Sequence, residues 1–229
     1  MWPSNGVYRK QMKRIVILGI GEFADILTGK IEANGRDQVW GYAVNKQYIT
    51  DDSYNQRKLI PFEDIEGYVS GKECQLYLGV IGKGMFKDRE RLFCELQQKG
   101  YKVENFISPT AVVQTEDIGQ GNIIMENAVI EKHCKIGNGN IIWPNVVLPH
   151  HNVIGDFNNL SPSVSLSGYA KIGNRCFIGN NACLSNHVSI QNCALVGGGV
   201  FVSEDLGEYQ VLVSSRSYVL EGKISTDFK

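Results

Sequence analysis

Two adjacent histidines, His150 and His151, are the residues of this chain best suited to moving a proton. The unperturbed pKa of histidine is about 6.5, so a neutral imidazole accepts a proton near neutral pH without a large pKa shift. Both stand in the segment Val147-Leu-Pro-His-His-Asn-Val-Ile-Gly-Asp-Phe157. The pair is therefore a candidate for acid–base chemistry, and the surrounding elements decide whether it is accessible.

A second candidate site is the glycine turn after the apolar run at residues 13–18. Gly19, Gly21 and Ala24 have a spacing that lets backbone approach a phosphate at the start of a helix. The second predicted strand, however, is followed by Asn45 and Lys46 instead of the acid that binds the ribose of NAD. These residues favour a nucleotide-sugar phosphate, or a purely structural turn, over a dinucleotide.

The second half of the chain repeats every six residues. Fifteen consecutive steps all fall on Ile, Leu or Val, at positions 118, 124, 130, 136, 142, 148, 154, 160, 166, 172, 178, 184, 190, 196 and 202. Four residues after most of them stands a small or aliphatic residue. This pattern predicts short strands with alternate side chains pointing inward, each ending in a tight corner.

Three such strands make a triangular coil of 18 residues, and stacked coils make a prism with an aliphatic core. Asn122, Asn140 and Asn158 are 18 residues apart in an inward position, so we expect them to form a hydrogen-bonded ladder. His133, His151 and His187 fall in one corner column, where His133 and His151 should lie about one strand spacing, ~4.8 Å, apart.

The first half predicts a small parallel α/β, Rossmann-like domain. We expect strands at 13–18, 38–43, 75–80 and 102–106 and helices at 25–33, 62–68 and 85–99. The predicted organisation is an arm at 1–11, the α/β domain at 12–108, the β-helix at 109–207 and a tail at 208–229. Ligands of such a domain bind at the carboxyl ends of the strands.

Composition and charge limit the classes of partner that this protein can have. A net charge of −1 and the absence of a basic run argue against nucleic acid as a partner. No apolar run reaches the roughly 18 residues of a membrane span, and the first residues lack the apolar core of a signal peptide, so we expect a cytoplasmic protein. Six cysteines without metal-finger spacing are expected to be thiols.

From residue 13 to about residue 205 the chain resembles the bacterial nucleotide-sugar acyltransferases of the sialic-acid and bacillosamine (NeuD/PglD-like) type, in the hexapeptide-repeat superfamily. The resemblance rests on residues 17–21, 99–111 and above all 147–157, together with Leu160-Ser-Pro162 and Ser167-Gly168. It implies a left-handed parallel β-helix and a homotrimer with active sites between copies. It also implies that the first domain binds a nucleotide-linked amino sugar and that the coil binds acetyl-coenzyme A or another acyl-coenzyme A.

The resemblance also implies roles for individual residues. It makes His150 the general base. His151 stands where many members have an acid that orients the base. Asn159 stands where members often have a second histidine, and it is expected to contact the acyl carbonyl. Gly168 and Gly198 correspond to positions that contact the pantetheine arm. Gly19, Gly21, Asn45 and Lys46 are the predicted substrate-binding residues.

The sequence therefore predicts an acyl-coenzyme A-dependent N-acyltransferase, most simply an N-acetyltransferase, for surface polysaccharide or glycan synthesis, without a metal. Three alternatives stay open at this stage. They are an O-acetyltransferase acting on a sugar hydroxyl, a zinc enzyme that hydrates carbon dioxide like other trimeric prisms, and a scaffold without activity. His133 and His151 would contribute to a zinc site, whereas His187 is too far along the column to complete it.

Overall fold

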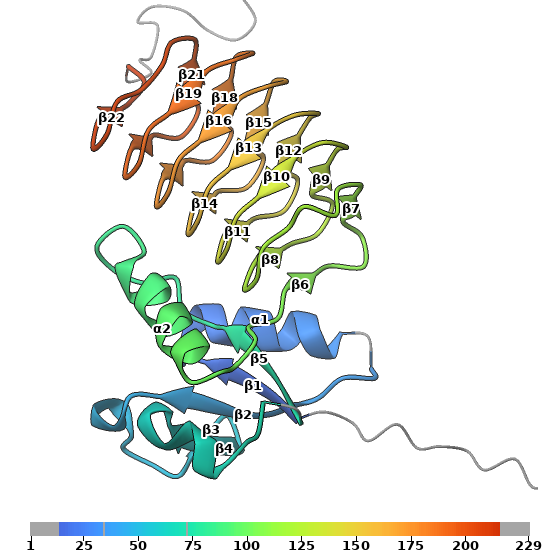
Figure 1. Cartoon of the computed structure of the whole chain (residues 1–229), viewed down its shortest axis with the longest axis vertical. Coiled ribbons are helices and arrows are strands. Elements are labelled where there is room, and N and C mark those ends of the chain that lie inside the picture. The colour runs from blue at the N-terminus through green and yellow to red at the C-terminus, as the bar shows by residue number, and fades with distance from the viewer. Residues whose placement is uncertain (1–13, 34, 72, 216–229) are drawn as a thin grey trace, which may run out of the picture.

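The computed structural model describes residues 14–33, 35–71 and 73–215. These residues form an α/β domain followed by a long left-handed β-helix, stacked along one axis (Figure 1). The arm predicted at residues 1–11 and the end of the predicted tail lie outside the described residues. Within the described part, no helix is both long enough and apolar enough to span a bilayer.

The α/β domain is built on a five-stranded sheet in the order β3-β4-β2-β1-β5. Its elements are β1 (Arg14–Leu18), α1 (Glu22–Glu32), β2 (Val39–Val44), the 3₁₀ turn Lys46–Tyr48, β3 (Ser53–Tyr54), β4 (Arg57–Pro61), the 3₁₀ helix Phe62–Gly67, β5 (Cys74–Leu78) and α2 (Lys87–Gln98). All pairings are parallel except that of β3 with β4. The parallel order places the carboxyl ends of β1, β2 and β5 side by side.

The two helices cover opposite faces of this sheet. Alternate residues of β1 point to opposite sides: Ile17 packs with Leu27 of α1, whereas Leu18 packs with Leu96 of α2. Helix α1 begins at Glu22, three residues before the predicted start, because Gly21 adopts a φ of 103° that ends the turn there. The strand β4 was missing from the sequence-based prediction because its run is short and half of it is polar.

The β-helix consists of three parallel sheets, one for each side of the prism. One sheet contains β10 (Lys135–Ile136), β13 (Val153–Ile154), β16 (Lys171–Ile172) and β19 (Ser189–Ile190). A second contains β7 (Val112–Val113), β9 (Val129–Ile130), β12 (Val147–Leu148), β15 (Ser165–Leu166), β18 (Cys183–Leu184) and β21 (Phe201–Val202). The third, called here the domain-facing sheet, contains β6 (Phe106–Ile107), β8 (Ile123–Ile124), β11 (Ile141–Ile142), β14 (Asn159–Leu160), β17 (Phe177–Ile178), β20 (Leu195–Val196) and β22 (Val211–Leu212).

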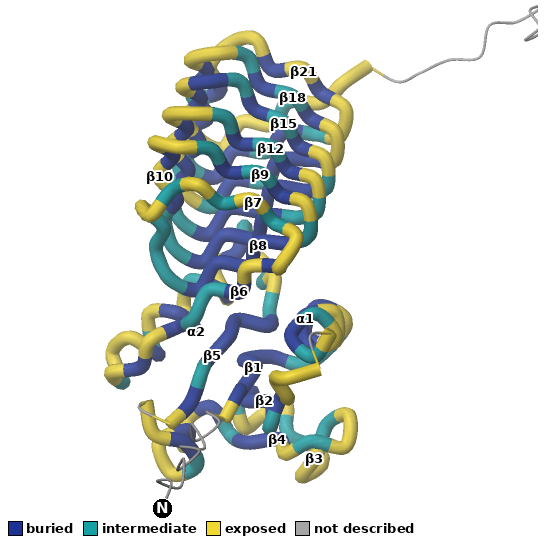
Figure 2. The backbone as a smooth tube through the Cα atoms, turned by 90° about the vertical axis from the view of Figure 1, so that its right-hand side faces the viewer, coloured by how far each residue is buried: buried dark blue, intermediate teal, exposed yellow. Residues whose placement is uncertain are grey.

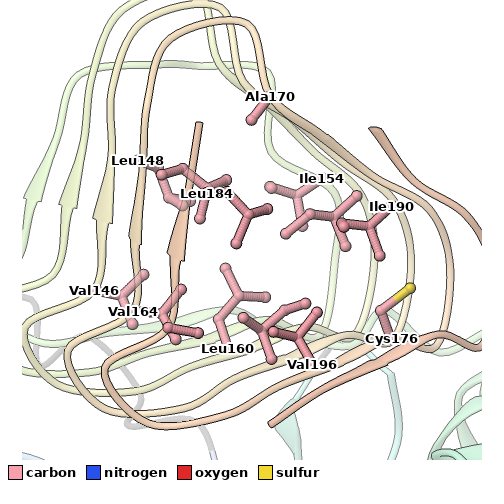
Figure 3. Packing of buried hydrophobic residues seen from close by; sticks show 14 of the residues in the cluster. Val146, Leu148, Ile154, Leu160, Val164, Ala170, Cys176, Leu184, Ile190 and Val196 are labelled. Atoms are coloured by element: carbon pink, nitrogen blue, oxygen red, sulfur yellow. The ribbon is translucent and has the colours of Figure 1, made fainter. Parts of the chain in front are cut away.

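The predicted six-residue period is confirmed as the core of this prism. Strands pair with a step of 18 residues, as in Ile142 with Leu160. All fifteen aliphatic positions belong to, or pack against, one hydrophobic cluster, which Figure 3 shows end-on. The small residues of the second register, such as Ala170 and Cys176, fill the narrow corners of the triangle. The core therefore follows directly from the sequence pattern.

Each corner contains one residue in the left-handed region of φ. Non-glycine examples recur every six residues at positions 127, 133, 145, 151, 157, 163, 169, 175, 181, 187 and 193. Such a conformation costs roughly 1–2 kcal/mol for an ordinary residue. The stacked hydrogen bonds between coils hold it in place, because most corners donate their backbone N–H to the coil before, as Phe157 does to the Asn138 carbonyl at 2.7 Å.

The asparagine ladder is also confirmed. The Oδ1 atom of Asn122 accepts from the backbone N–H of Asn140 at 2.8 Å, and the Oδ1 atom of Asn140 accepts from that of Asn158 at 2.8 Å. The Nδ2 group of Asn140 donates to Asn122 and to the carbonyl of Gly155. The Nδ2 group of Asn158, in contrast, has no partner.

Replacing Asn140 with alanine is expected to lower the free energy of unfolding by about 2–6 kcal/mol, because it leaves the buried N–H of Asn158 and the partly buried carbonyl of Gly155 without partners, at about 1–3 kcal/mol each. Replacing Asn158 with alanine is the matched control. It should cost about 1 kcal/mol less, because one of its amide groups is already unpaired. Urea unfolding monitored by circular dichroism measures both values, and equal losses would contradict the ladder.

The two parts pack over the outer face of the domain-facing sheet. Ile123 and Ile141 pack in one cluster with Leu27, and Phe93 of α2 meets Phe157 at 5.4 Å between ring centroids. Figure 2 shows buried strands in both parts, with many of the β-helix corners exposed. The strand predicted at 102–106 is reduced to a single bridge of Val103 with Leu76 of β5, and Phe106–Ile107 joins β8 of the β-helix instead, because its N–H and C=O groups lie beside the first coil.

Candidate active site

A pocket of about 660 Å³, called here the sheet pocket, lies at the carboxyl ends of β1, β2 and β5. Its lining includes Gly19, Ile20, Phe23, Asn45, Tyr48, Gly79, Val80, Lys83, Asp88 and Arg91. This is the position that the parallel topology predicts for a ligand. Lys83 and Arg91 contribute positive charge, and the side chain of Tyr48 is exposed at the rim.

Four of the predicted substrate-binding residues belong to this region, and two of them line the pocket. Gly19 and Asn45 are part of the lining. Gly21 is not, and its N–H donates to the Tyr54 hydroxyl at 3.1 Å. Lys46 is not either, because its ammonium forms an ion pair with Asp64 at 2.8 Å, which raises its pKa. The roles of these four residues in binding stay predictions.

The glycine turn is required by packing at the floor of the pocket. Gly19 has a φ of 112°, and a Cβ there would lie 2.3 Å from Cγ1 of Val80. A Cβ on Gly79 would likewise lie 2.3 Å from Cγ2 of Ile17. The ends of β1 and β5 therefore approach each other more closely than any side chain permits.

His150 lies at an exposed corner, directly after β12 and Pro149, as the six-residue frame predicts. Its backbone N–H donates to Oε2 of Glu131 at 2.9 Å. Its Nδ1 atom lies 3.1 Å from Nδ1 of His151. One of these two nitrogens must carry the proton between them. When that nitrogen is Nδ1 of His150, its Nε2 atom keeps a lone pair that is free to accept a proton.

His151 is held in a column of stacked rings along the same corner. Its ring lies 4.8 Å from His133 and 4.7 Å from Tyr169, centroid to centroid, and Tyr169 lies 4.9 Å from His187. The edge of Tyr169 also meets His150 at 5.3 Å. The predicted proximity of His133 and His151 is confirmed, and Tyr169 fills the step before His187.

The environment keeps His151 neutral. Desolvation lowers its pKa below the ordinary histidine value, and repulsion from a positive charge on His133 or His150 lowers the pKa further. A neutral His151 offers its Nδ1 lone pair to the Nδ1–H of His150. It can thus orient the ring of His150, although it stabilises an imidazolium less well than a carboxylate does.

The absence of a side chain at Gly168 leaves room for the imidazole of His150. A Cβ on Gly168 would lie 2.7 Å from Cε1 of His150, so any side chain there would displace the imidazole. Gly198 is exposed on a later coil, and a Cβ there would lie 3.3 Å from the carbonyl oxygen of Asn180. The predicted contacts of both glycines with a pantetheine arm stay predictions.

Asn159 lies on the domain-facing sheet, away from the His150 corner. It is 4% exposed, its Oδ1 atom accepts from Nε1 of Trp143 at 2.9 Å, and its Nδ2 group donates to Oγ of Ser161 at 3.0 Å. Trp143 in turn packs against Phe23, which lines the sheet pocket. Asn159 therefore does not line the pocket itself; it contacts Trp143, which contacts the lining residue Phe23. Its role toward an acyl carbonyl stays a prediction.

The His150 corner and the sheet pocket lie on opposite sides of the prism. In Figure 3, Ala170 marks the corner between the side of Leu148 and the side of Ile154, whereas Leu160 and Val196 belong to the third side. That third side is the domain-facing sheet. His151 and Tyr169 occupy the corner of Ala170, one coil apart. A single chain therefore does not bring His150 to its own sheet pocket.

Among residues 14–33, 35–71 and 73–215, no three His, Cys, Asp or Glu side chains are grouped so that they would hold a metal ion. The column of rings separates His187 from His151 by Tyr169. The zinc alternative thus finds no complete ligand set within the described part of one chain.

Comparison with known proteins agrees with this geometry. Residues 117–150 match the model of the bacterial transferase hexapeptide family (six repeats). The acetyltransferase domain of PglB from Neisseria gonorrhoeae FA1090, in complex with acetyl coenzyme A, superposes with a TM-score of 0.77 at 20% identity, covering 88% of this chain and 96% of that chain. The chain has the fold of a hexapeptide-repeat acetyltransferase.

Two further solved structures share this hexapeptide-repeat acetyltransferase fold over both domains. A mutant of perosamine N-acetyltransferase from Caulobacter crescentus, in complex with CoA and GDP-perosamine, has a TM-score of 0.77 at 23% identity, covering 89% of this chain and 94% of that chain. WeeI from Acinetobacter baumannii AYE has a TM-score of 0.76 at 18% identity, covering 88% and 97%. No curated protein matches the sequence.

Proposed function

We propose that this protein is an acetyl-coenzyme A-dependent N-acetyltransferase acting on a nucleotide-linked amino sugar. The observation that carries the proposal is the exposed His150, whose Nδ1 atom is engaged by His151, on a chain with the hexapeptide-repeat acetyltransferase fold. The complexes of the similar proteins contain acetyl coenzyme A, or CoA with GDP-perosamine, which matches the two substrates proposed here. Its place in surface polysaccharide or glycan synthesis and its cytoplasmic location belong to the same proposal.

In the proposed reaction the neutral amine of the sugar attacks the thioester carbonyl. The new C–N bond forms as the C–S bond breaks, and coenzyme A leaves as the thiol. Nε2 of His150 accepts the proton that the nitrogen loses and passes it to the departing sulfur. The Nδ1–H of His150 donates to Nδ1 of His151 throughout, which fixes the ring and its tautomer. No covalent enzyme intermediate is needed.

The sheet pocket supplies the nucleotide-binding part of the site. Its volume of about 660 Å³ suits a nucleotide. Lys83 and Arg91 are placed to pair with a diphosphate, and the exposed ring of Tyr48 offers a face on which a base can stack. The glycine turn at Gly19 leaves backbone close to the ligand.

The active site is completed between copies of the chain. Because the His150 corner lies opposite the domain-facing sheet, His150 of one copy must meet the sheet pocket of another. A ring of three prisms repeats this heterologous contact and closes on itself, which gives a homotrimer with three equivalent sites. Acetyl-coenzyme A is then expected to lie along the seam between two prisms.

The proposal is tested by turnover with a panel of UDP-, dTDP- and GDP-linked amino sugars and acetyl-coenzyme A, with a thiol-reactive dye to measure released coenzyme A. We expect one amino-sugar nucleotide to release thiol stoichiometrically with the acetamido product. Matched sugars with a hydroxyl in place of the amine should be at least about tenfold poorer substrates. If no amino sugar releases thiol, or if only hydroxyl sugars do, the proposed function is wrong.

The activity is expected to fall steeply at acid pH. When the pH falls below the lowered pKa of His151, the Nδ1 atom of this residue becomes protonated. It then no longer accepts a hydrogen bond from His150. Loss of this acceptor leaves the ring of His150 without its orienting partner, so kcat/KM should fall as the pH is lowered through the pKa of His151. A carboxylate in the same place stays ionised to about pH 4.3. The H151E variant should therefore lose less of its kcat/KM over the same pH range, and equal losses in the two proteins would contradict the orienting role of His151.

A further inference from the structure

The most unusual charged group outside the His150 corner is Arg89 of α2. Its side chain is 1% exposed, yet no carboxylate of the described residues is paired with it. Taking a guanidinium out of water costs several kcal/mol unless hydrogen bonds replace the lost solvent. Burial lowers the pKa of Arg89 to about 9, so the group is charged at neutral pH.

Four backbone carbonyls take the place of the missing acid. In the α/β domain, Nη1 of Arg89 donates to the Leu78 carbonyl at 2.9 Å and to the Val80 carbonyl at 2.6 Å. In the β-helix, Nη2 donates to Gly121 at 3.0 Å and Nε donates to Gly139 at 2.7 Å. One planar group therefore joins the end of β5 to two successive corners of the coil.

The two ends of this link are functionally different. Val80 lines the sheet pocket and lies two residues beyond Leu78, the last residue of β5, where ladder hydrogen bonds end. Gly121 and Gly139 are corner residues with φ of 70° and 65°, and a Cβ on Gly139 would lie 2.3 Å from the ring of Phe157. Arg89 thus connects the floor of the pocket to a closely packed edge of the prism.

We propose that Arg89 is a positioning residue that fixes the sheet pocket against the β-helix, so that the amine of a bound nucleotide sugar lies in register with the His150 of the neighbouring copy. This inference rests on the proposed function. Without Arg89 the end of β5 loses two hydrogen bonds and the pocket shifts relative to the coil. A displacement of about 1 Å at a reacting group is enough to cost up to a hundredfold in rate.

Two variants of Arg89 and one control test this role. The R89M variant keeps the volume and removes the charge and all four hydrogen bonds, whereas R89K keeps the charge and some of the hydrogen bonds. The control is R175M, because Arg175 also links the β-helix to α2, through an ion pair with Glu90 at 3.1 Å, but does not touch β5. The full chain is used in all cases.

We expect R89M to raise KM for the nucleotide sugar at least about tenfold and to lower kcat about tenfold, with KM for acetyl-coenzyme A changed less than about twofold. R89K should recover part of both losses, and R175M should behave like the wild type. A purely structural role would instead lower the active fraction and leave both KM values unchanged. If R89M does not fold, a KM for the nucleotide sugar unchanged in R89K overturns the proposal.

A measurement without substrate separates this inference from the proposed function. Hydrogen exchange of the backbone amides at residues 79–84 should accelerate about tenfold or more in R89K or R89M and stay unchanged in R175M. If the wild-type chain acetylates no amino sugar, the proposed function fails while this measurement still decides the positioning role. Equal exchange at residues 79–84 in the wild type and the Arg89 variants would overturn the positioning role even in an active enzyme.

Discussion

The H150A variant is expected to lose at least about a hundredfold in kcat, because positioned general bases contribute factors of about 10² to 10⁴. The loss should appear in kcat and in kcat/KM alike, since His150 contacts the reacting nitrogen and its proton mainly in the transition state. KM for either substrate should stay within a few fold. Steady-state kinetics with the best amino-sugar nucleotide of the panel measures all three quantities.

The variant should fold normally, because the His150 side chain is exposed and its backbone hydrogen bonds, to Glu131 and from the N–H of Tyr169, survive the substitution. H187A is the matched control: His187 stands in the same corner column and stacks on Tyr169, but the structure shows no contact between it and His150. Its turnover should remain within about threefold of the wild type. Unchanged turnover in H150A, or equal losses in both variants, would remove His150 as the base.

Two inactive variants are expected to restore activity when they are assembled together. The first is H150A, and the second is the K83E/R91E double variant, whose sheet pocket repels a diphosphate. A site formed between copies works when one copy supplies His150 and its neighbour supplies an intact pocket. Random equal mixing gives this combination at about a quarter of the sites.

The experiment unfolds the two variants, mixes them and refolds them, with each variant refolded alone as a control. Refolded wild type sets the scale, and about a quarter of its activity is the expected result. Refolded separately and mixed afterwards, the two variants should stay inactive. Absence of recovery in the refolded mixture, when refolded wild type is active, would contradict a site shared between copies.

The β-helix was largely predictable from the sequence because its determinants are local and repeated. Each coil uses the same positions for large and small residues, so an error at one position does not change the interpretation of the others. The ladder of Asn122, Asn140 and Asn158 was predictable for the same reason: a spacing of 18 residues places the same groups one strand apart. The exposed corner position of His150 follows from the same frame.

The α/β domain was less predictable at its edges. Strand β4 has a short, partly polar sequence, and residues 102–105, Lys-Val-Glu-Asn, contain one apolar residue, which pairs with β5 through a single bridge. Sheet edges depend on which backbone groups find partners, and those partners come from distant parts of the chain. The attachment of Phe106–Ile107 to β8 is a case in which the β-helix supplied the partner.

The candidate site likewise combines features that the sequence predicts with features that only the structure shows. Periodicity and residue type by themselves determined the coil, its aliphatic core, the corner that carries His150 and His151, and a ligand pocket at the carboxyl ends of the parallel strands. Only the tertiary structure decided the Nδ1 contact within the histidine pair, the burial of Asn159 behind Trp143, and the four carbonyls around Arg89. The hydrogen bonds from Arg89 to Gly121 and Gly139 join residues 32 and 50 positions apart without a repeating spacing, and they exist only after the two domains have packed together.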